Sequence, residues 1–281
     1  MRINKLAGAL AVVGLATISG TAFATNGYFS HGYGMKAKGM GGAATATASD
    51  AVGGANNPAS MVWVGDRLDL GVDWFRPIRS AKREAGAAPF TEDSSSNNFF
   101  VPELGYNKML GSNMSLGVTV YGNGGMNTTY NKGNTLSSVG ACGSAPTNPL
   151  CGTGNLGVNL EQLVIAPTFA YKLNEQHSIG VSPLIGYQRF GAAGLQAFAA
   201  ISNDGANLTN RGYDDAWGWG VRLGWQGRVS NTVTLGAAYS TKIKMDKFDK
   251  YKGLFAEQGD FDIPENFNLG VAWKADRKSV V

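Results

Sequence analysis

Residues 217–226 read Trp-Gly-Trp-Gly-Val-Arg-Leu-Gly-Trp-Gln, so large apolar side chains alternate with small or polar ones. Successive side chains of a β-strand point to opposite faces, and the stretch therefore predicts a strand with one apolar face. Residues 66–75 repeat the alternation, with Trp74 again on the apolar face. This pattern is typical of a transmembrane β-barrel, which turns its apolar side outward to lipid and encloses a polar lumen.

The rest of the chain repeats this pattern, which predicts an all-β fold, a transmembrane antiparallel β-barrel. Short turns at 110–112, 174–176 and 230–231 alternate with long polar connections. Such barrels have short periplasmic turns and long outer loops. About eight strands are expected, over residues 66–75, 98–109, 113–122, 157–173, 178–190, 217–226, 232–245 and 265–273. By parity, the charged residues expected on the lumen face are Asp69, Asp73, Glu103, Arg222, Arg228, Lys242 and Lys244.

Composition excludes two other classes of protein. The chain has 281 residues, of which 40 are Gly and 16% are charged, and its mean hydropathy is -0.11. It contains no long uncharged apolar run, which argues against a helical membrane protein. Its net charge of +4 is small and no basic block stands out, so nucleic acid is not an expected partner.

The first residues predict an export signal. Arg2 and Lys5 precede a short apolar stretch from residue 6 to residue 18, and Ala22-Phe23-Ala24 forms a small-x-small cleavage pattern. The stretch is too short to serve well as a membrane anchor helix. We therefore expect a signal peptide over residues 1–24 and export of the remaining chain.

Residues 25–65 differ from the predicted strands, because they are rich in Gly, Ala, Ser and Thr and show no alternation. Ser49-Asp50 and Asn56-Asn57-Pro58 are capping and turn signals, which favour a compact hatch of short helices over a flexible tail. Residues 66–281 form the predicted partial barrel. A barrel of about eight strands is too narrow to hold a hatch. We therefore expect a wider barrel whose C-terminal strands are missing from this sequence.

The two cysteines, Cys142 and Cys151, lie in a loop rich in Gly, Pro and Asn. In an exported protein, this spacing favours a local disulfide. A metal or redox pair is the alternative, but there is no CxxC motif and no neighbouring His. We expect a structural bridge and no metal site.

Several motifs follow one another in the order found in a known family. Residues 26–34 read Asn-Gly-Tyr-Phe-Ser-His-Gly-Tyr-Gly, residues 38–43 read Lys-Gly-Met-Gly-Gly-Ala, and Asn57-Pro58-Ala59 ends the predicted hatch. Weaker matches are Pro102, residues 121–125, residues 173–174 and residues 263–265. The chain resembles the FadL family of outer-membrane transporters for long-chain fatty acids and other hydrophobic compounds, most closely the branch that includes toluene and hydrocarbon uptake.

This resemblance implies a barrel of about fourteen strands with an N-terminal hatch, which fits the even strand number of such barrels. It also implies passive uptake, with lateral release through a gap in the wall at a kink in the third strand. Glycines permit such a kink, although they could equally begin an ordinary loop. The residues implied are Gly122, Gly124 and Gly125 for the kink, Tyr28, Phe29, Arg222 and Lys242 for ligand contact, and Asn57, Pro58 and Ala59 as a structural hatch motif.

Three classes of function are weighed. Uptake of long-chain fatty acids or other hydrophobic compounds is preferred, with a non-selective outer-membrane porin as the alternative. A barrel enzyme is not expected, because neither His31 nor His177 lies with a Ser and a carboxylate at a recognisable spacing. The predicted protein is a monomer of the Gram-negative outer membrane, without a cofactor, whose partners are its hydrophobic cargo and membrane lipid.

Overall fold

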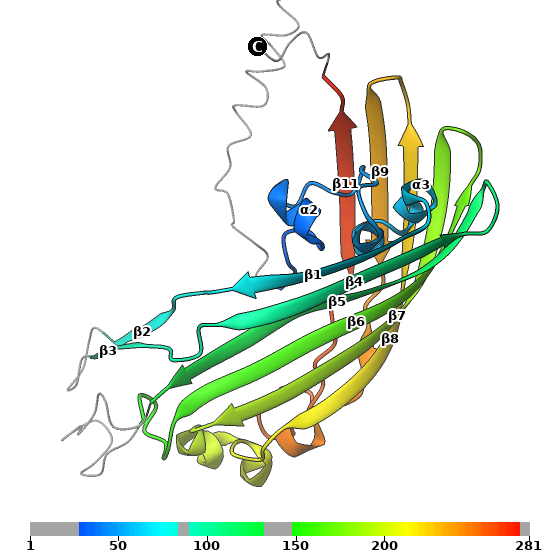
Figure 1. The fold of residues 1–281 in the computed structure, drawn as a ribbon. Coiled ribbons are helices and arrows are strands. Elements are labelled where there is room, and N and C mark those ends of the chain that lie inside the picture. Colours follow the sequence, from blue (N-terminus) through cyan, green and yellow to red (C-terminus); the bar gives the residue numbers. More distant parts are fainter. Residues whose placement is uncertain (1–27, 84–89, 132–147, 276–281) are drawn as a thin grey trace, which may run out of the picture.

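A curled antiparallel sheet forms the wall of the molecule, and short helices lie on its concave side (Figure 1). The computed structural model describes residues 28–83, 90–131 and 148–275, so the predicted signal peptide lies outside the described residues. The nine-stranded sheet has the order β1-β4-β5-β6-β7-β8-β9-β11, and β10 pairs with β8. Its edge strands are β1 and β11, and within the described residues no helix is long and apolar enough to cross a membrane.

The long strands lie where the alternation predicted them. Their bounds are β1 Arg67–Phe75, β4 Phe99–Met109, β5 Met114–Tyr130, β6 Leu156–Lys172, β7 His177–Ala193, β8 Asp214–Arg228, β9 Val233–Ser240 and β11 Asn266–Trp273. A separate hairpin of β2 Ser80–Arg83 and β3 Phe90–Asp93 extends beyond β1. This hairpin was not predicted, because its mainly polar residues show no apolar alternation.

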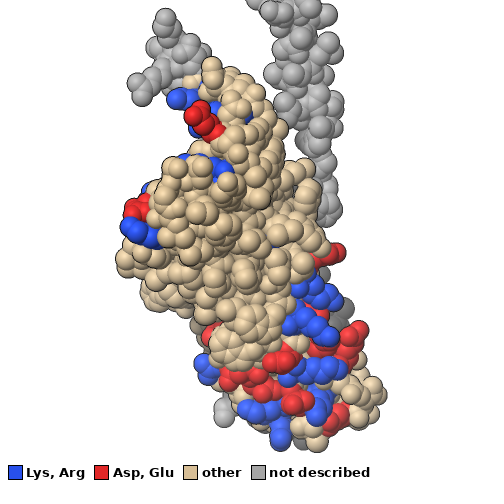
Figure 2. All heavy atoms as spheres, turned by 90° about the vertical axis from the view of Figure 1, so that its right-hand side faces the viewer, with Lys and Arg blue, Asp and Glu red and all other residues tan. Residues whose placement is uncertain are grey.

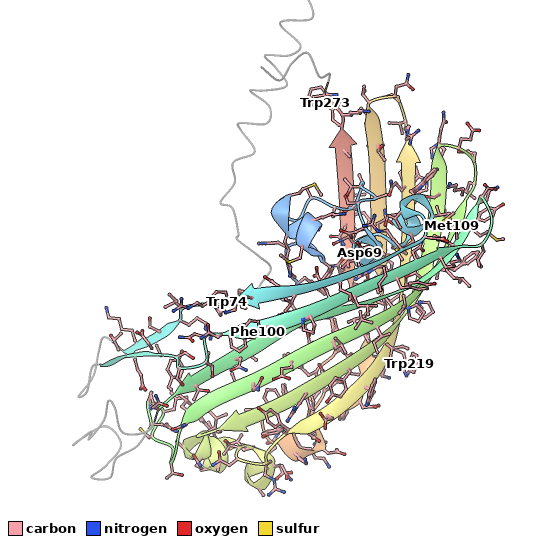
Figure 3. All side chains as sticks on the ribbon, viewed as in Figure 1. Asp69, Trp74, Phe100, Met109, Trp219 and Trp273 are labelled. Carbon is pink, nitrogen blue, oxygen red and sulfur yellow. The ribbon has the colours of Figure 1, made fainter. Side chains whose placement is uncertain are left out.

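The two faces of the sheet have opposite chemistry. Apolar side chains cover the convex face, where Trp219 is 65% exposed and Leu70 is 71% exposed. Figure 3 shows Trp219 projecting away from the sheet, while Asp69 points toward the helices. The face in Figure 2 carries a broad uncharged band, and its charged residues gather mainly at the end where the long connections lie. An apolar band bordered by charge is the outer surface of a membrane barrel.

Two strand boundaries differ from the prediction. β5 runs to Tyr130 rather than ending near Gly122. Its residues beyond Gly122 stay paired with β6 although they have no alternating apolar face. β9 ends at Ser240, whereas a strand to residue 245 was expected. Arg222 pairs with Ser240 and Trp219 pairs with Lys244, so one extra residue lies between Ser240 and Lys244.

That extra residue reverses the predicted parity beyond β9. A bulge of one residue moves every following side chain to the other face. Ile243, expected to face lipid, is buried on the inner side. Lys244, expected in the lumen, lies in β10 (Lys244–Met245) opposite the outward Trp219. The assignment of Lys244 to the lumen face was therefore wrong.

The N-terminal segment, residues 28–65, contains α2 Met35–Gly39, η1 Ala51–Ala55, η2 Pro58–Ser60 and α3 Met61–Val64. Side chains begin two of these elements. Asp50 accepts a hydrogen bond from Gly53 N, and Asn57 accepts one from Ala59 N next to a proline at the first turn. Both are N-cap arrangements that short helices need. The sequence signals at Ser49-Asp50 and Asn56-Asn57-Pro58 therefore mark the starts of η1 and η2.

Candidate functional site

Asn57 joins the N-terminal segment to the wall. Its side chain is fully buried, and Nδ2 donates to the carbonyl oxygens of Thr45 and of Trp225 in β8, at 2.8 and 2.9 Å. Its Oδ1 accepts from Ala59 N at 3.0 Å. A buried amide with partners on every side fixes position more than it adds stability. Asn57-Pro58-Ala59 thus lies at the contact between the segment and β8.

Glycines on the inner face allow this contact. Gly180 in β7 pairs with Gly224 in β8, and both lie directly beneath the Asn-Pro-Ala turn. A Cβ built on Gly180 would lie 2.6 Å from Pro58 O, and one built on Gly224 would lie 2.7 Å from Pro58 Cδ. Only glycine permits so close an approach of two backbones.

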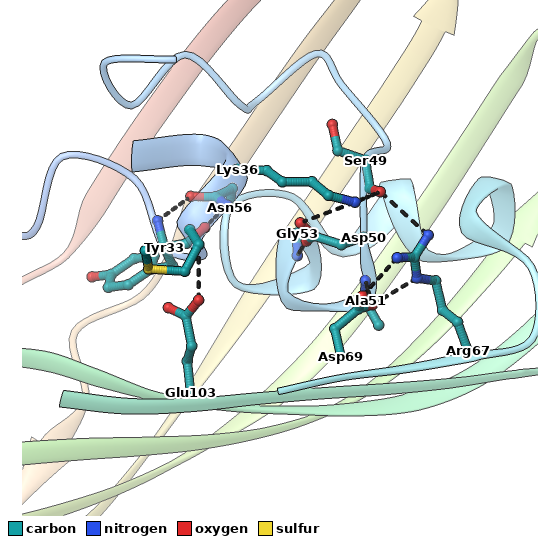
Figure 4. A network of polar contacts seen from close by, with 11 residues as sticks. Tyr33, Lys36, Ser49, Asp50, Ala51, Gly53, Asn56, Arg67, Asp69 and Glu103 are labelled. Atoms are coloured by element: carbon teal, nitrogen blue, oxygen red, sulfur yellow. Dashed lines mark hydrogen bonds and ion pairs between the residues drawn. The ribbon is translucent and has the colours of Figure 1, made fainter. Parts of the chain in front are cut away.

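Carboxylates of the wall accept hydrogen bonds from the first backbone amides of two helices (Figure 4). Glu103 of β4 accepts a hydrogen bond from Met35 N at the first residue of α2, at 2.8 Å. Asp69 of β1 accepts one from Ala51 N at the first residue of η1, also at 2.8 Å. Carboxylates suit these positions because the first amides of a helix have no partner within it. The predicted lumen positions Glu103 and Asp69 therefore hold the segment against β1 and β4.

Two ion pairs support the same edge. Lys38 of α2 pairs with Asp73 of β1 at 2.8 Å, and Arg67 pairs with Asp69 at 2.6 Å. All four side chains are partly exposed, so each pair contributes modestly to stability. Only the Lys38–Asp73 pair joins the segment to the wall, because Arg67 and Asp69 both lie in β1.

Arg222, one of the two predicted ligand-binding cations, is buried between the wall and the N-terminal segment. Its side chain donates to Ala55 O of η1, and its Nε donates to Ser240 Oγ at 2.6 Å. The guanidinium carbon also lies 6.0 and 5.8 Å from the ring centres of Tyr33 and Tyr121. Arg222 faces the lumen, as parity predicted, but its donors contact protein groups.

Lys242, the other predicted cation, lies apart from Arg222. Its side chain is 62% exposed and pairs with Asp262 at 3.2 Å. It follows β9 within the bulge that reverses parity, so the alternation rule did not apply to it. Its role in ligand binding stays a prediction.

Tyr28 and Phe29 form an aromatic group near the inner face. Their ring centres are 5.3 Å apart in an edge arrangement, and the Tyr28 ring lies 6.4 Å from that of Phe261. Both pack against buried apolar residues of the sheet and of the segment that follows β9. Burial raises the pKa of Tyr28, whose hydroxyl accepts a hydrogen bond from Gln162 at 2.8 Å. That these rings contact a ligand stays a prediction.

The wall loses its continuous pairing between β4 and β5. Their ladder ends at Glu103 and Tyr121, although β4 continues back to Phe99 and β5 onward to Tyr130. We call the stretch over which β4 and β5 do not pair with each other, residues 99–102 of β4 and 122–126 of β5, the lateral seam. These residues stay paired with β1 and β6 on their other sides, apart from the bulge in β5. Beyond the seam, Arg79 donates to Asn127 O, and Ser95 N donates to Thr129 O at 2.9 Å, which closes the outer end.

β5 is also irregular on its other side at the same level. Gly122 pairs with Leu163 of β6 and Gly124 pairs with Gln162, so Asn123 is an extra residue and forms a β-bulge. A bulge bends its strand and re-aims a side chain. Pro102 lies at the first seam position of β4, where the missing N–H removes no ladder bond to β5. The predicted glycines therefore flank a bulge, and their role in lateral release stays a prediction.

Three polar residues near the seam were not predicted from the sequence, namely Tyr33, Asn123 and Gln162. Asn123 lies within a run of glycines, and a bulge carries no alternation signal. Cys142 lies outside the described residues, so its bridge to Cys151 also stays a prediction.

Comparisons with known proteins agree with this architecture. A family model described as outer membrane protein transport protein (OMPP1/FadL/TodX) matches residues 11–278. The toluene transporter TodX of Pseudomonas putida is 18% identical, with a TM-score of 0.64 over 88% of this chain and 68% of TodX. The toluene transporter TbuX of Ralstonia pickettii is 17% identical, with a TM-score of 0.63 over 88% of this chain and 69% of TbuX.

No curated protein matches the chain significantly. The family match nevertheless covers most of the sequence, and its members are outer-membrane transport proteins rather than enzymes. The curled sheet with an apolar outer face is the fold that such a protein requires. This chain therefore belongs to the OMPP1/FadL/TodX family of outer membrane transport proteins.

Proposed function

We propose that the protein takes up uncharged hydrophobic molecules and releases them sideways through the lateral seam. The observation that carries this proposal is the loss of pairing between β4 and β5, beside a bulge in β5. A molecule can cross a wall only where the backbone ladder is interrupted, because a closed ladder presents no opening. The apolar convex face then receives the molecule in the lipid.

An aqueous porin, the alternative function, fits these contacts less well. The N-terminal segment contacts β4, β5, β7 and β8, and buried side chains such as Asn57 and Arg222 fill the space between. A segment held by hydrogen bonds on so many strands would obstruct an open water channel. A transporter that binds and hands on its cargo does not need such a channel.

The two candidate cations favour an uncharged cargo over a carboxylate. Arg222 already donates to Ala55 O and Ser240 Oγ, and Lys242 is paired with Asp262. A fatty acid head group would have to displace these partners, whereas an uncharged aromatic ring would need only apolar contact, as Tyr28 and Phe29 offer. TodX and TbuX, which share the fold, are toluene transporters, and this supports the same choice.

A disulfide across the seam provides the test. A Cβ built on Gly122 would lie 4.0 Å from Val101 Cβ, within the separation of about 3.5–4.5 Å that a disulfide spans. The double variant Val101→Cys/Gly122→Cys should therefore join β4 to β5 on oxidation. We expect toluene uptake into vesicles to fall when the variant is oxidised and to recover on reduction.

Two controls make the result specific. Leu104→Cys/Val120→Cys joins β4 to β5 where the ladder already pairs them, so its oxidation should leave uptake unchanged. The wild type with and without reductant measures any effect of the native cysteines. Equal uptake by the oxidised seam variant and this control would refute lateral release. Uptake of palmitate that matches uptake of toluene would refute the preference for uncharged cargo.

A further inference from the structure

A chain of buried polar side chains joins the N-terminal segment to the bulge at the lateral seam. The Tyr33 hydroxyl donates to Asn123 Oδ1 at 2.8 Å, and Asn123 Nδ2 donates to Gln162 Oε1 at 3.2 Å. Gln162 Nε2 donates in turn to the Tyr28 hydroxyl at 2.8 Å and to Gln188 Oε1 at 3.0 Å. Asn123 is the extra residue of the bulge, so the segment contacts β5 at its irregular point.

Tyr33 is itself held firmly. Its N–H donates to Asn56 Oδ1 at 2.9 Å, and Asn56 Nδ2 donates to Tyr33 O at 2.7 Å. Its ring centre lies 4.3 Å from that of Tyr121, the last residue of β5 that pairs with β4. Burial raises the pKa of the Tyr33 phenol, which therefore stays protonated and can donate to Asn123.

The first described residue of the segment contacts the same place. A Cβ built on Gly124 would lie 2.7 Å from Tyr28 O, so the backbone of Tyr28 lies directly against β5 next to the bulge. Tyr28 and Tyr33 therefore hold Asn123 from two sides, one through Gln162 and one directly. Asn123 is 2% exposed, and an amide buried to this degree needs both of its partners.

We propose that Tyr33 and Asn123 are a positioning pair that couples the N-terminal segment to the seam. With the hydrogen bond made, the Asn123 side chain is held inward and β5 keeps its bulge away from the β4 ladder. When the segment moves, the bulge loses this support and the seam changes its geometry. The inference rests on the proposed lateral release for its meaning in transport, but the coupling can be measured separately.

The experiment measures seam geometry in the full chain through the rate of disulfide formation in Val101→Cys/Gly122→Cys. Adding Tyr33→Phe removes one hydroxyl and keeps the ring against Tyr121. We expect the cross-linking rate to change by about three- to ten-fold, the range that loss of one buried hydrogen bond implies. Toluene uptake by Tyr33→Phe without the cysteines should fall by a similar factor.

Tyr251→Phe is the matched control, because Tyr251 is also buried and its hydroxyl bonds away from the seam, donating to Gly212 O and accepting from Ala192 N. It should leave both measurements unchanged. Tyr28→Phe tests the second arm and should shift the cross-linking rate in the same direction as Tyr33→Phe. A Tyr33→Phe rate equal to that of Tyr251→Phe would overturn the coupling. A shifted rate with unchanged uptake would support the coupling and count against lateral release.

Discussion

Gly224→Ala tests whether the glycines of the inner face exist to admit the N-terminal segment. The new Cβ would lie 2.7 Å from Pro58 Cδ and closer still to Asn57 Oδ1. Carbon atoms in ordinary contact are about 3.5–4.0 Å apart, so the Asn-Pro-Ala turn must move by about 1 Å. That movement also disturbs the bonds from Asn57 Nδ2 to Trp225 O and from Ala59 N to Asn57 Oδ1.

The expected cost combines three effects. Overfilling a closely packed contact costs about 1–3 kcal/mol. Weakening the two hydrogen bonds costs about 0.5–1.5 kcal/mol each, while alanine restricts the unfolded chain and returns about 0.4–1 kcal/mol. The net destabilisation is about 1–6 kcal/mol. Because the strain acts at the contact, release of the segment from the wall is the expected response.

Urea unfolding in lipid vesicles measures this cost, and limited proteolysis of residues 28–65 shows whether the segment is released. Gly39→Ala is the matched control, since a Cβ there would meet nothing within 4 Å. In helix α2 this change should be neutral or stabilising by up to about 1 kcal/mol. Equal unfolding midpoints and equal proteolysis of the two variants would refute the reasoning.

Two further substitutions test the Asn57 contact and the assignment of the lipid face. Asn57→Ala removes three hydrogen bonds of a fully buried amide. We expect the unfolding free energy to fall by about 2–4 kcal/mol and the ion conductance in planar bilayers to rise. Conductance equal to that of wild type would mean that the segment does not obstruct the lumen. Leu223→Arg places a charge on the lipid face, where Leu223 is 53% exposed, and should lower the unfolding free energy by about 2–4 kcal/mol if the site is near the bilayer midplane. The same change at Val229, in a turn beyond β8, should cost less than about 0.5 kcal/mol, and equal losses at the two positions would contradict the assignment of the lipid face.

The strands could be predicted because lipid constrains one face of each of them. Leu223 and Trp219 must be apolar wherever a barrel meets lipid, so the alternation of β8 is visible in the sequence. The inner face carries no such constraint, and its polar residues satisfy one another in many ways. The sequence therefore placed Arg222 and Glu103 on the lumen side but could not identify their partners in the N-terminal segment.

β-Bulges explain why some residues lie on the face of the sheet opposite to the one predicted. One extra residue before Lys244 and one at Asn123 break the period of two, and neither leaves a mark in the hydrophobic pattern. Residues before a bulge, such as Tyr239, therefore follow the parity rule, while Ile243 and Lys244 after it are reversed. The seam could be anticipated only as a cluster of glycines, because pairing between β4 and β5 depends on register rather than on residue type.

The chemistry of the inner contact also bears on how the segment can move. Asn57, Glu103 and Asp69 hold the segment through hydrogen bonds to backbone groups. Water can replace such bonds when the segment shifts. Each contributes about 0.5–1.5 kcal/mol net between neutral groups and about 1.5–3 kcal/mol where a carboxylate accepts. The segment also buries apolar side chains such as Met61 and Val62 against the sheet, and moving them into water costs about 25 cal/mol per Å². The hydrogen bonds therefore fix where the segment lies, while exposure of its buried apolar side chains adds to the free energy of its displacement.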